Sequence, residues 1–122
     1  DGMAVFNFGI SEEPRDVKNL IAAAGLNITD VDLLIYHQAN KFMTNFFTKW
    51  LKFDKNKTPY SIQKYGNTSS ASIPLTIVSE LENGYPQRDK VVLSGFGAGL
   101  SWGSALINLA NCKISTLTEY KG

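Results

Sequence analysis

Two short runs of entirely apolar residues most limit the folds open to this chain. Residues 33–36 (LLIY) and 91–93 (VVL) contain no charged or strongly polar position, and both are far shorter than an ordinary helix. Such runs are typical of strands that are covered on both faces, which occur mainly in parallel sheets flanked by helices. The two runs therefore favour the α/β class.

Three further segments are expected to join these runs in one sheet. Residues 3–8 (MAVFNF) are apolar and favour a strand, residues 61–65 follow a polar loop, and residues 100–109 read as apolar on both faces. The turn between the last two strands is too short for a crossover connection, so the last strand must run antiparallel to its neighbour. We therefore expect a mixed five-stranded sheet.

Apolar residues at helical spacing separate most of these strands. A helix is expected over residues 11–25, and a second is expected to follow Asn40 as its N-cap. A third should follow residues 66–70 and run to about Glu82, where Asn83-Gly84 would end it. This alternation of strands and helices predicts helices on both faces of the sheet.

The composition is that of a globular domain and excludes several classes of protein. The 122 residues are 43% hydrophobic with a net charge of +1, which argues against a disordered chain and a general nucleic-acid binder. No apolar window approaches the roughly 18 residues of a membrane span, and residues 1–4 lack the basic region of a signal peptide. With Cys112 as the only cysteine, we expect one domain over residues 1–122 in a reducing compartment, the cytoplasm.

Polar or glycine-rich residues follow three of the expected strands. His37, Gly66-Asn67 and the glycine-rich turn 95–99 each come directly after a strand, at the edge where ligands of such sheets bind. We therefore expect a site at this edge. Two structural alternatives stay open: His37 can be a hydrogen-bonded structural residue, and the turn can be a plain hairpin, because its glycines do not match a dinucleotide-binding fingerprint.

A metal site and a Cys-His nucleophile are not expected. His37 is the only histidine, no carboxylate stands at ligand spacing from it, and Cys112 lies in a polar segment after the last strand.

Lysines are concentrated in the middle of the chain. Residues 41–64 contain six lysines and one acidic residue, Asp54. This excess is either an ordinary solvated face or a basic patch that attracts an acidic partner, and composition alone does not separate the two.

Four segments together resemble a known family. They are DGMAVF (1–6), HQAN (37–40), YGNTSSAS (65–72) and GFGAGLSWG (95–103). In this order and at these intervals they are similar to the carboxyl-terminal half of β-ketoacyl-acyl-carrier-protein synthase III, a thiolase-fold condensing enzyme. The resemblance implies one of two similar halves, each with a five-stranded mixed sheet between helices. It also implies that the nucleophilic cysteine belongs to the amino-terminal half, which we expect to lie outside this chain.

The resemblance also implies roles for the residues at the sheet edge. His37 and Asn67 match the catalytic histidine and asparagine of the family, whose neutral N–H groups hold the oxygen of an enolate. Backbone N–H groups of the turn Gly97-Ala98-Gly99 match a second oxyanion hole, and Phe96 matches an aromatic residue beside the nucleophile.

A carrier-protein contact is implied as well. The family engages its acyl carrier protein through the stretch that here reads Gln38, Ala39, Asn40, Lys41 and Phe42, with Phe42 where the family often has arginine. The lysine excess suits an acidic carrier protein.

The expected activity is decarboxylative condensation of an acyl-CoA primer with malonyl-acyl-carrier-protein at the start of fatty acid synthesis, without a cofactor, in a homodimer. Two alternatives are a relative that makes a specialised β-keto product and a non-catalytic half that only docks a carrier protein. Without its nucleophile, this chain alone is expected to be inactive.

Overall fold

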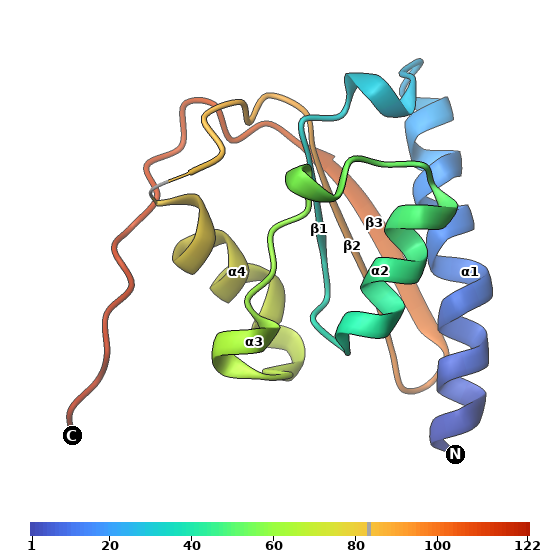
Figure 1. Ribbon diagram of the computed structural model, residues 1–122, viewed down its shortest axis with the longest axis horizontal. Helices are drawn as coiled ribbons and strands as arrows, with labels where there is room; N and C mark the ends of the chain where they lie inside the picture. The colour runs from blue at the N-terminus through green and yellow to red at the C-terminus, as the bar shows by residue number, and fades with distance from the viewer. Residues whose placement is uncertain (83) are drawn as a thin grey trace.

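The computed structural model describes residues 1–82 and 84–122, which form a three-stranded sheet with helices on both faces (Figure 1). Besides three short 3₁₀ helices, η1 (Ile28–Asp30), η2 (Lys55–Lys57) and η3 (Ser69–Ala71), the elements in chain order are α1 (Gly2–Ala23), β1 (Leu33–Tyr36), α2 (Lys41–Trp50), α3 (Ile62–Tyr65), α4 (Ser72–Leu81), β2 (Val91–Gly97) and β3 (Ser101–Ile107).

The sheet has the order β1-β2-β3. β1 pairs in parallel with β2, and Leu33 lies opposite Val91. β3 pairs antiparallel with β2, and Ser101 lies opposite Gly97, so the last strand runs as expected. All four residues of β1 are buried, which confirms that the first apolar run is covered on both faces.

Helices cover both faces of the sheet, as the sequence predicts (Figure 1). Residues of α1 and α2, including Val17 and Phe47, pack with Leu34 and Tyr36 on one face. On the other face, Leu81 of α4 packs with the remaining residues of β1 and the start of β2; these are Leu33, Ile35 and Val91. β1 therefore lies in the core because its alternate side chains meet two different helical layers.

The strand expected over residues 3–8 is wrong, because this segment is the beginning of α1. The side chain of Asp1 caps the helix by accepting a hydrogen bond from the backbone N–H of Met3 at 3.0 Å. The helix then continues past Ser11, where a helix was expected to begin, and holds Pro14 in its interior. The apolar residues of this segment satisfy a helix as well as a strand, and packing against β2 and β3 decides for the helix.

The strand expected over residues 61–65 is also wrong, because residues 62–65 form the short helix α3. The side chain of Gln38 supplies the physical reason: its Oε1 accepts hydrogen bonds from the backbone N–H groups of Ser61 at 3.1 Å and Ile62 at 3.2 Å. These donors are therefore not available to a neighbouring strand. With both segments helical, the described residues form three strands instead of the expected five.

The helix expected after Asn40 is confirmed. Asn40 caps α2 by accepting a hydrogen bond from the backbone N–H of Met43 through its side-chain oxygen at 2.9 Å. The third expected helix is α4, which begins at Ser72 and is preceded by the 3₁₀ helix η3. Its expected end at Asn83 lies outside the described residues. No helix of the part described is long and apolar enough to cross a bilayer.

Candidate functional site

A pocket of about 330 Å³ lies where β1 and β2 end and α4 begins. It is lined by His37, Ser69, Ser70, Ser72, Ile73, Gly95, Phe96 and Gly97. Because β1 and β2 are parallel, their carboxyl ends meet at one edge, and the segment before α4 closes the third side. The structure therefore brings His37 together with the glycine-rich end of β2, as the sequence predicts.

His37 is held by one backbone bond and one side-chain bond. Its backbone N–H donates to the carbonyl oxygen of Ser94 at 2.7 Å, which continues the pairing of β1 with β2 by one residue. Its ring Nδ1 lies 2.6 Å from the hydroxyl oxygen of Ser72. Desolvation lowers the pKa of the half-buried imidazole, which favours the neutral ring at neutral pH.

A buried carboxyl group supports β2 beneath this site. The hydroxyl of Ser94 donates a hydrogen bond of 2.8 Å to Oε1 of Glu13, a residue of α1 that is only 2% exposed. Burial, opposed by this hydrogen bond and aided by the charge of Asp16, raises the pKa of Glu13 to about 8. Ser94 therefore joins α1 through its side chain and His37 through its backbone.

Two glycines allow close packing around the site. A Cβ atom on Gly9 would lie 2.7 Å from Cε2 of Phe96, so a larger residue there would force this ring or α1 to shift. A Cβ atom on Gly95 would lie 3.4 Å from Cβ of His37, which is tight contact. Phe96 in turn packs edge-on to the imidazole of His37, with ring centroids 6.3 Å apart.

Asn67 lies in the loop that leads into the pocket. It is exposed, and its Oδ1 accepts a hydrogen bond from the backbone N–H of Ser69 at 2.9 Å. Ser69 lines the pocket, whereas Asn67 is not among the lining residues. The Nδ2 amide group of Asn67, its only side-chain donor, has no hydrogen-bond partner among the described residues. That this group meets the same oxygen atom as His37 stays a prediction.

The glycine-rich segment is mostly strand. Residues 95–97 belong to β2, and the turn to β3 consists of Ala98, Gly99 and Leu100, so the plain hairpin is the correct structural description. Gly99 has a φ of +82°, which requires the conformational freedom of glycine. Gly97 lines the pocket, while Ala98 and Gly99 are exposed at the hairpin tip.

The stretch expected to engage a carrier protein contains both buried and exposed residues. Gln38 is 1% exposed, and its side chain is used entirely within the fold, so it offers no surface to a partner. Ala39 is half-buried, and Asn40 caps α2. Lys41 is exposed, and Phe42 is 67% exposed at the start of α2. The exposed residues of this stretch are therefore Asn40, Lys41 and Phe42.

The lysine-rich segment is less basic than its count indicates. Lys64 forms an ion pair with Glu80, with the ammonium nitrogen 2.8 Å from a carboxylate oxygen. Lys41, Lys49 and Lys52 are exposed in and just after α2. Lys55 is exposed and Lys57 half-buried in η2, and neither forms an ion pair among the described residues, so the positive charge extends from α2 into the loop that follows it.

Among the described residues there is no cluster of three or more histidine, cysteine or acidic residues that could hold a metal ion. Cys112 is exposed and follows β3, which ends beside Val91 at the opposite edge of the sheet from His37. The two side chains do not form a pair.

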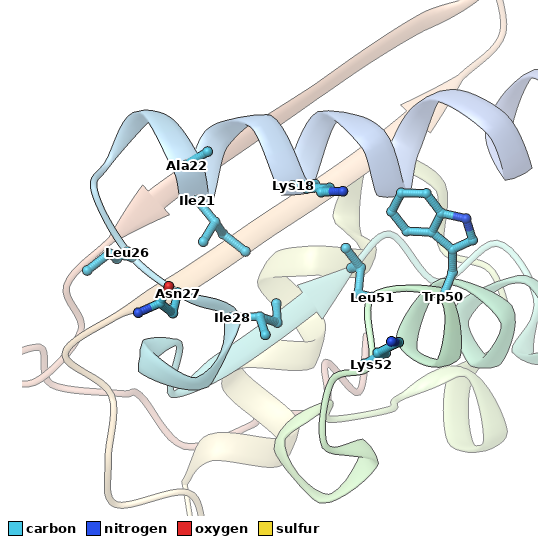
Figure 2. Close-up of a pocket in the computed structure, with 9 residues that line it drawn as sticks. All are labelled: Lys18, Ile21, Ala22, Leu26, Asn27, Ile28, Trp50, Leu51 and Lys52. Atoms are coloured by element: carbon cyan, nitrogen blue, oxygen red, sulfur yellow. The ribbon is translucent and has the colours of Figure 1, made fainter.

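A second, larger cavity of about 440 Å³ lies at the far end of α2 (Figure 2). In this view Lys18 of α1 approaches Trp50 of α2, and the ammonium nitrogen lies 5.8 Å from the indole centroid. The cavity is mostly apolar, and apart from Lys52 of the lysine-rich segment it is lined by none of the predicted site residues. We therefore place the candidate site at the pocket around His37.

Several site residues were missed by the sequence analysis. Ser72 lies within the segment 65–72 that carries the family resemblance, but its contact with His37 spans 35 positions in the chain. Glu13 was expected only to open a helix, and its contact with Ser94 spans 81 positions. The one local signal for Ser72 was that it is a hydroxyl residue at the expected start of a helix, near the end of a strand.

The α/β unit has the thiolase-like fold of the condensing enzymes. The structure resembles that of 3-oxoacyl-(acyl carrier protein) synthase III from Pseudomonas aeruginosa, with a TM-score of 0.83 and 33% identity over 88% of this chain and 34% of that chain. A 3-oxoacyl-(acyl-carrier protein) synthase from Burkholderia xenovorans gives a TM-score of 0.86 and 34% identity over 96% of this chain and 34% of that chain.

Sequence comparison gives the same result. The family model for the carboxyl-terminal part of 3-oxoacyl-[acyl-carrier-protein] synthase III matches residues 21–109, so the chain belongs to this family. β-Ketoacyl-[acyl-carrier-protein] synthase III of Streptococcus gordonii is 38% identical over 112 residues, which are 89% of this chain and 35% of the relative. The chain thus spans about one third of the length of the relatives that it matches.

Proposed function

We propose that this chain is the carboxyl-terminal catalytic half of a 3-oxoacyl-[acyl-carrier-protein] synthase III. The observation that carries the proposal is the imidazole of His37, held neutral in a pocket at the strand ends of a fold that belongs to this family. A neutral imidazole can donate one N–H to an oxygen that gains charge without giving up its proton. Decarboxylative condensation requires such a donor.

In the proposed reaction, the C–C bond to the carboxylate of a malonyl thioester breaks and CO₂ leaves. The electron pair forms an enolate, whose oxygen accepts hydrogen bonds from Nε2–H of His37 and Nδ2–H of Asn67. The enolate carbon then attacks the acyl-thioester of a cysteine in the amino-terminal half, and the cysteine thiolate leaves. The backbone near Gly97, Ala98 and Gly99 would hold the oxygen of that second thioester.

The remaining parts of the proposal concern the whole protein. An acyl-CoA primer and malonyl-acyl-carrier-protein are the substrates, no cofactor takes part, and the enzyme works as a cytoplasmic homodimer. The nucleophile lies outside residues 1–122, so this chain alone is proposed to be inactive.

The test is a turnover assay of the whole protein with a series of acyl-CoA primers and malonyl-acyl-carrier-protein. We expect release of CO₂ together with a β-ketoacyl product, and the best primer identifies the substrate. Residues 1–122 alone should release none. A whole protein that binds the carrier protein but neither releases CO₂ nor forms product would contradict the proposal and favour a docking function.

Carrier-protein docking at the start of α2 leads to a separate prediction. Lys41→Glu should raise the KM for malonyl-acyl-carrier-protein about tenfold at low salt, because it replaces an attractive charge by a repulsive one. Steady-state kinetics at two salt concentrations measure this change, which added salt should reduce. Lys113→Glu, in the exposed segment after β3, is the matched control and should leave the KM unchanged. Equal KM values for the two variants would exclude this docking surface.

A further inference from the structure

Ser72 contacts both the imidazole and the backbone of the histidine segment. Its hydroxyl oxygen lies 2.6 Å from Nδ1 of His37 and accepts a hydrogen bond from the backbone N–H of Gln38 at 3.2 Å. Ser72 is only 1% exposed, so solvent does not compete for this hydroxyl. The serine therefore connects the first residue of α4 to two successive residues after β1.

The direction of the bond to His37 follows from the available donors and acceptors. The hydroxyl of Ser72 carries one proton, and a buried O–H group requires an acceptor. Within residues 1–82 and 84–122, Nδ1 of His37 is the acceptor within hydrogen-bond distance of this oxygen. The N–H group of Gln38 already occupies one lone pair of the same oxygen. The O–H group of Ser72 therefore donates to Nδ1.

We propose that Ser72 is the positioning residue that fixes the tautomer of His37. With Nδ1 as the acceptor, the proton of the neutral ring is on Nε2, because the partner of one ring nitrogen sets the state of the other. This inference deepens the proposed function and rests on it. It explains how the imidazole presents an N–H group, and not a lone pair, to the enolate oxygen.

The surrounding contacts hold the serine in place. Its carbonyl oxygen accepts a hydrogen bond from the hydroxyl of Thr76 at 2.7 Å, and this hydroxyl also lies 2.6 Å from the hydroxyl of Ser61. The backbone N–H of Ser61 in turn donates to the side chain of Gln38. The loop before α3, the start of α4 and the segment after β1 thus form one buried network around Ser72.

The test measures the tautomer directly. In the whole protein labelled with ¹⁵N-histidine, the signal of His37 is identified by its loss in His37→Gln. Long-range ¹H–¹⁵N spectra of the wild type at neutral pH should show the Nε2–H tautomer. An Nδ1–H tautomer in the wild type would overturn the proposal without any variant of Ser72.

Variants extend the test to activity. Ser72→Ala should shift His37 toward the Nδ1–H tautomer and lower kcat for malonyl decarboxylation at least about tenfold, with KM and cysteine acylation unchanged. Ser72→Thr keeps a hydroxyl and should restore the tautomer and most of the rate. Ser79→Ala removes a hydroxyl from the same helix, α4, at a position that does not line the pocket, and is the matched control.

The outcomes separate this inference from the proposed function. If Ser72→Ala keeps both the tautomer and the rate of the wild type, Ser72 is not a positioning residue. If His37→Ala itself decarboxylates at the wild-type rate, the proposed function fails. The tautomer of His37, compared between the wild type and Ser72→Ala, still shows whether Ser72 positions the ring. Unchanged cysteine acylation shows that a variant has folded.

Discussion

Replacing His37 by alanine in the whole protein should slow malonyl decarboxylation by about a hundredfold to a thousandfold, the usual cost of losing one donor to a developing oxyanion. His37 lines the pocket at the strand ends, and its Nδ1 is bound to Ser72, so the proposed donor that alanine removes is Nε2–H. Asn67→Ala should have an effect of similar size, because its Nδ2 group is the proposed second donor. Release of labelled CO₂ from malonyl-acyl-carrier-protein measures both.

The control is the other half-reaction of the same variants. Transfer of the acyl primer to the nucleophilic cysteine does not pass through the malonyl enolate, so it should proceed at close to the wild-type rate. This comparison separates loss of the oxyanion donor from loss of the fold. If both variants decarboxylate as fast as the wild type, the roles of His37 and Asn67 are wrong.

Glu13→Gln should change the pH dependence of stability. The folded-state pKa of Glu13 is raised to about 8, so between the ordinary carboxyl pKa and pH 8 the folded state holds a proton that the unfolded state has lost. The free energy of unfolding therefore falls as the pH rises through this range, by about 1.4 kcal/mol for each pH unit. From pH 5 to pH 8 the loss amounts to up to about 4 kcal/mol.

Glutamine removes this dependence but keeps an oxygen for the hydroxyl of Ser94 to donate to. Relative to the wild type, the variant should thus become more stable as the pH rises, which urea unfolding of the whole protein at pH 5, 6.5 and 8 measures. The matched control is Glu12→Gln, which removes the neighbouring, partly exposed carboxyl group and should keep the slope of the wild type. Equal slopes for Glu13→Gln and the wild type would show that Glu13 does not hold its proton in the folded state.

The strands of the sheet could be predicted only where the sequence pattern does not also suit a helix. Residues 33–36 and 91–93 are too short and too apolar for a surface helix, and both are strands. Residues 3–8 suit a helix or a strand, since strand preference depends on what the segment packs against. Their capping by Asp1 and their place on the sheet face decided for α1. Residues 61–65 are helical because Gln38, far away in the sequence, takes the first N–H groups of this segment.

The candidate site was predictable in outline. The edge with His37 and the end of β2 follows from the rule that parallel strands end together, and the structure forms a pocket there. The sequence did not show which of residues 38–42 are buried and which are exposed, because a glutamine can be exposed as easily as buried. Only the fold shows that Gln38 is fully enclosed while Phe42 is exposed.

By itself, the sequence determined the α/β class, the buried strands, the edge that holds His37 and the family to which the chain belongs. These properties follow from local patterns and motifs, which adjacent residues carry. The tertiary structure decided the number of strands, the hydrogen-bond partner of the imidazole and the burial of Glu13 against Ser94. Such properties depend on contacts between residues far apart in the chain. A hydroxyl or carboxyl group meets its hydrogen-bond partner, and the pKa of a carboxyl group shifts, only when folding removes the group from water.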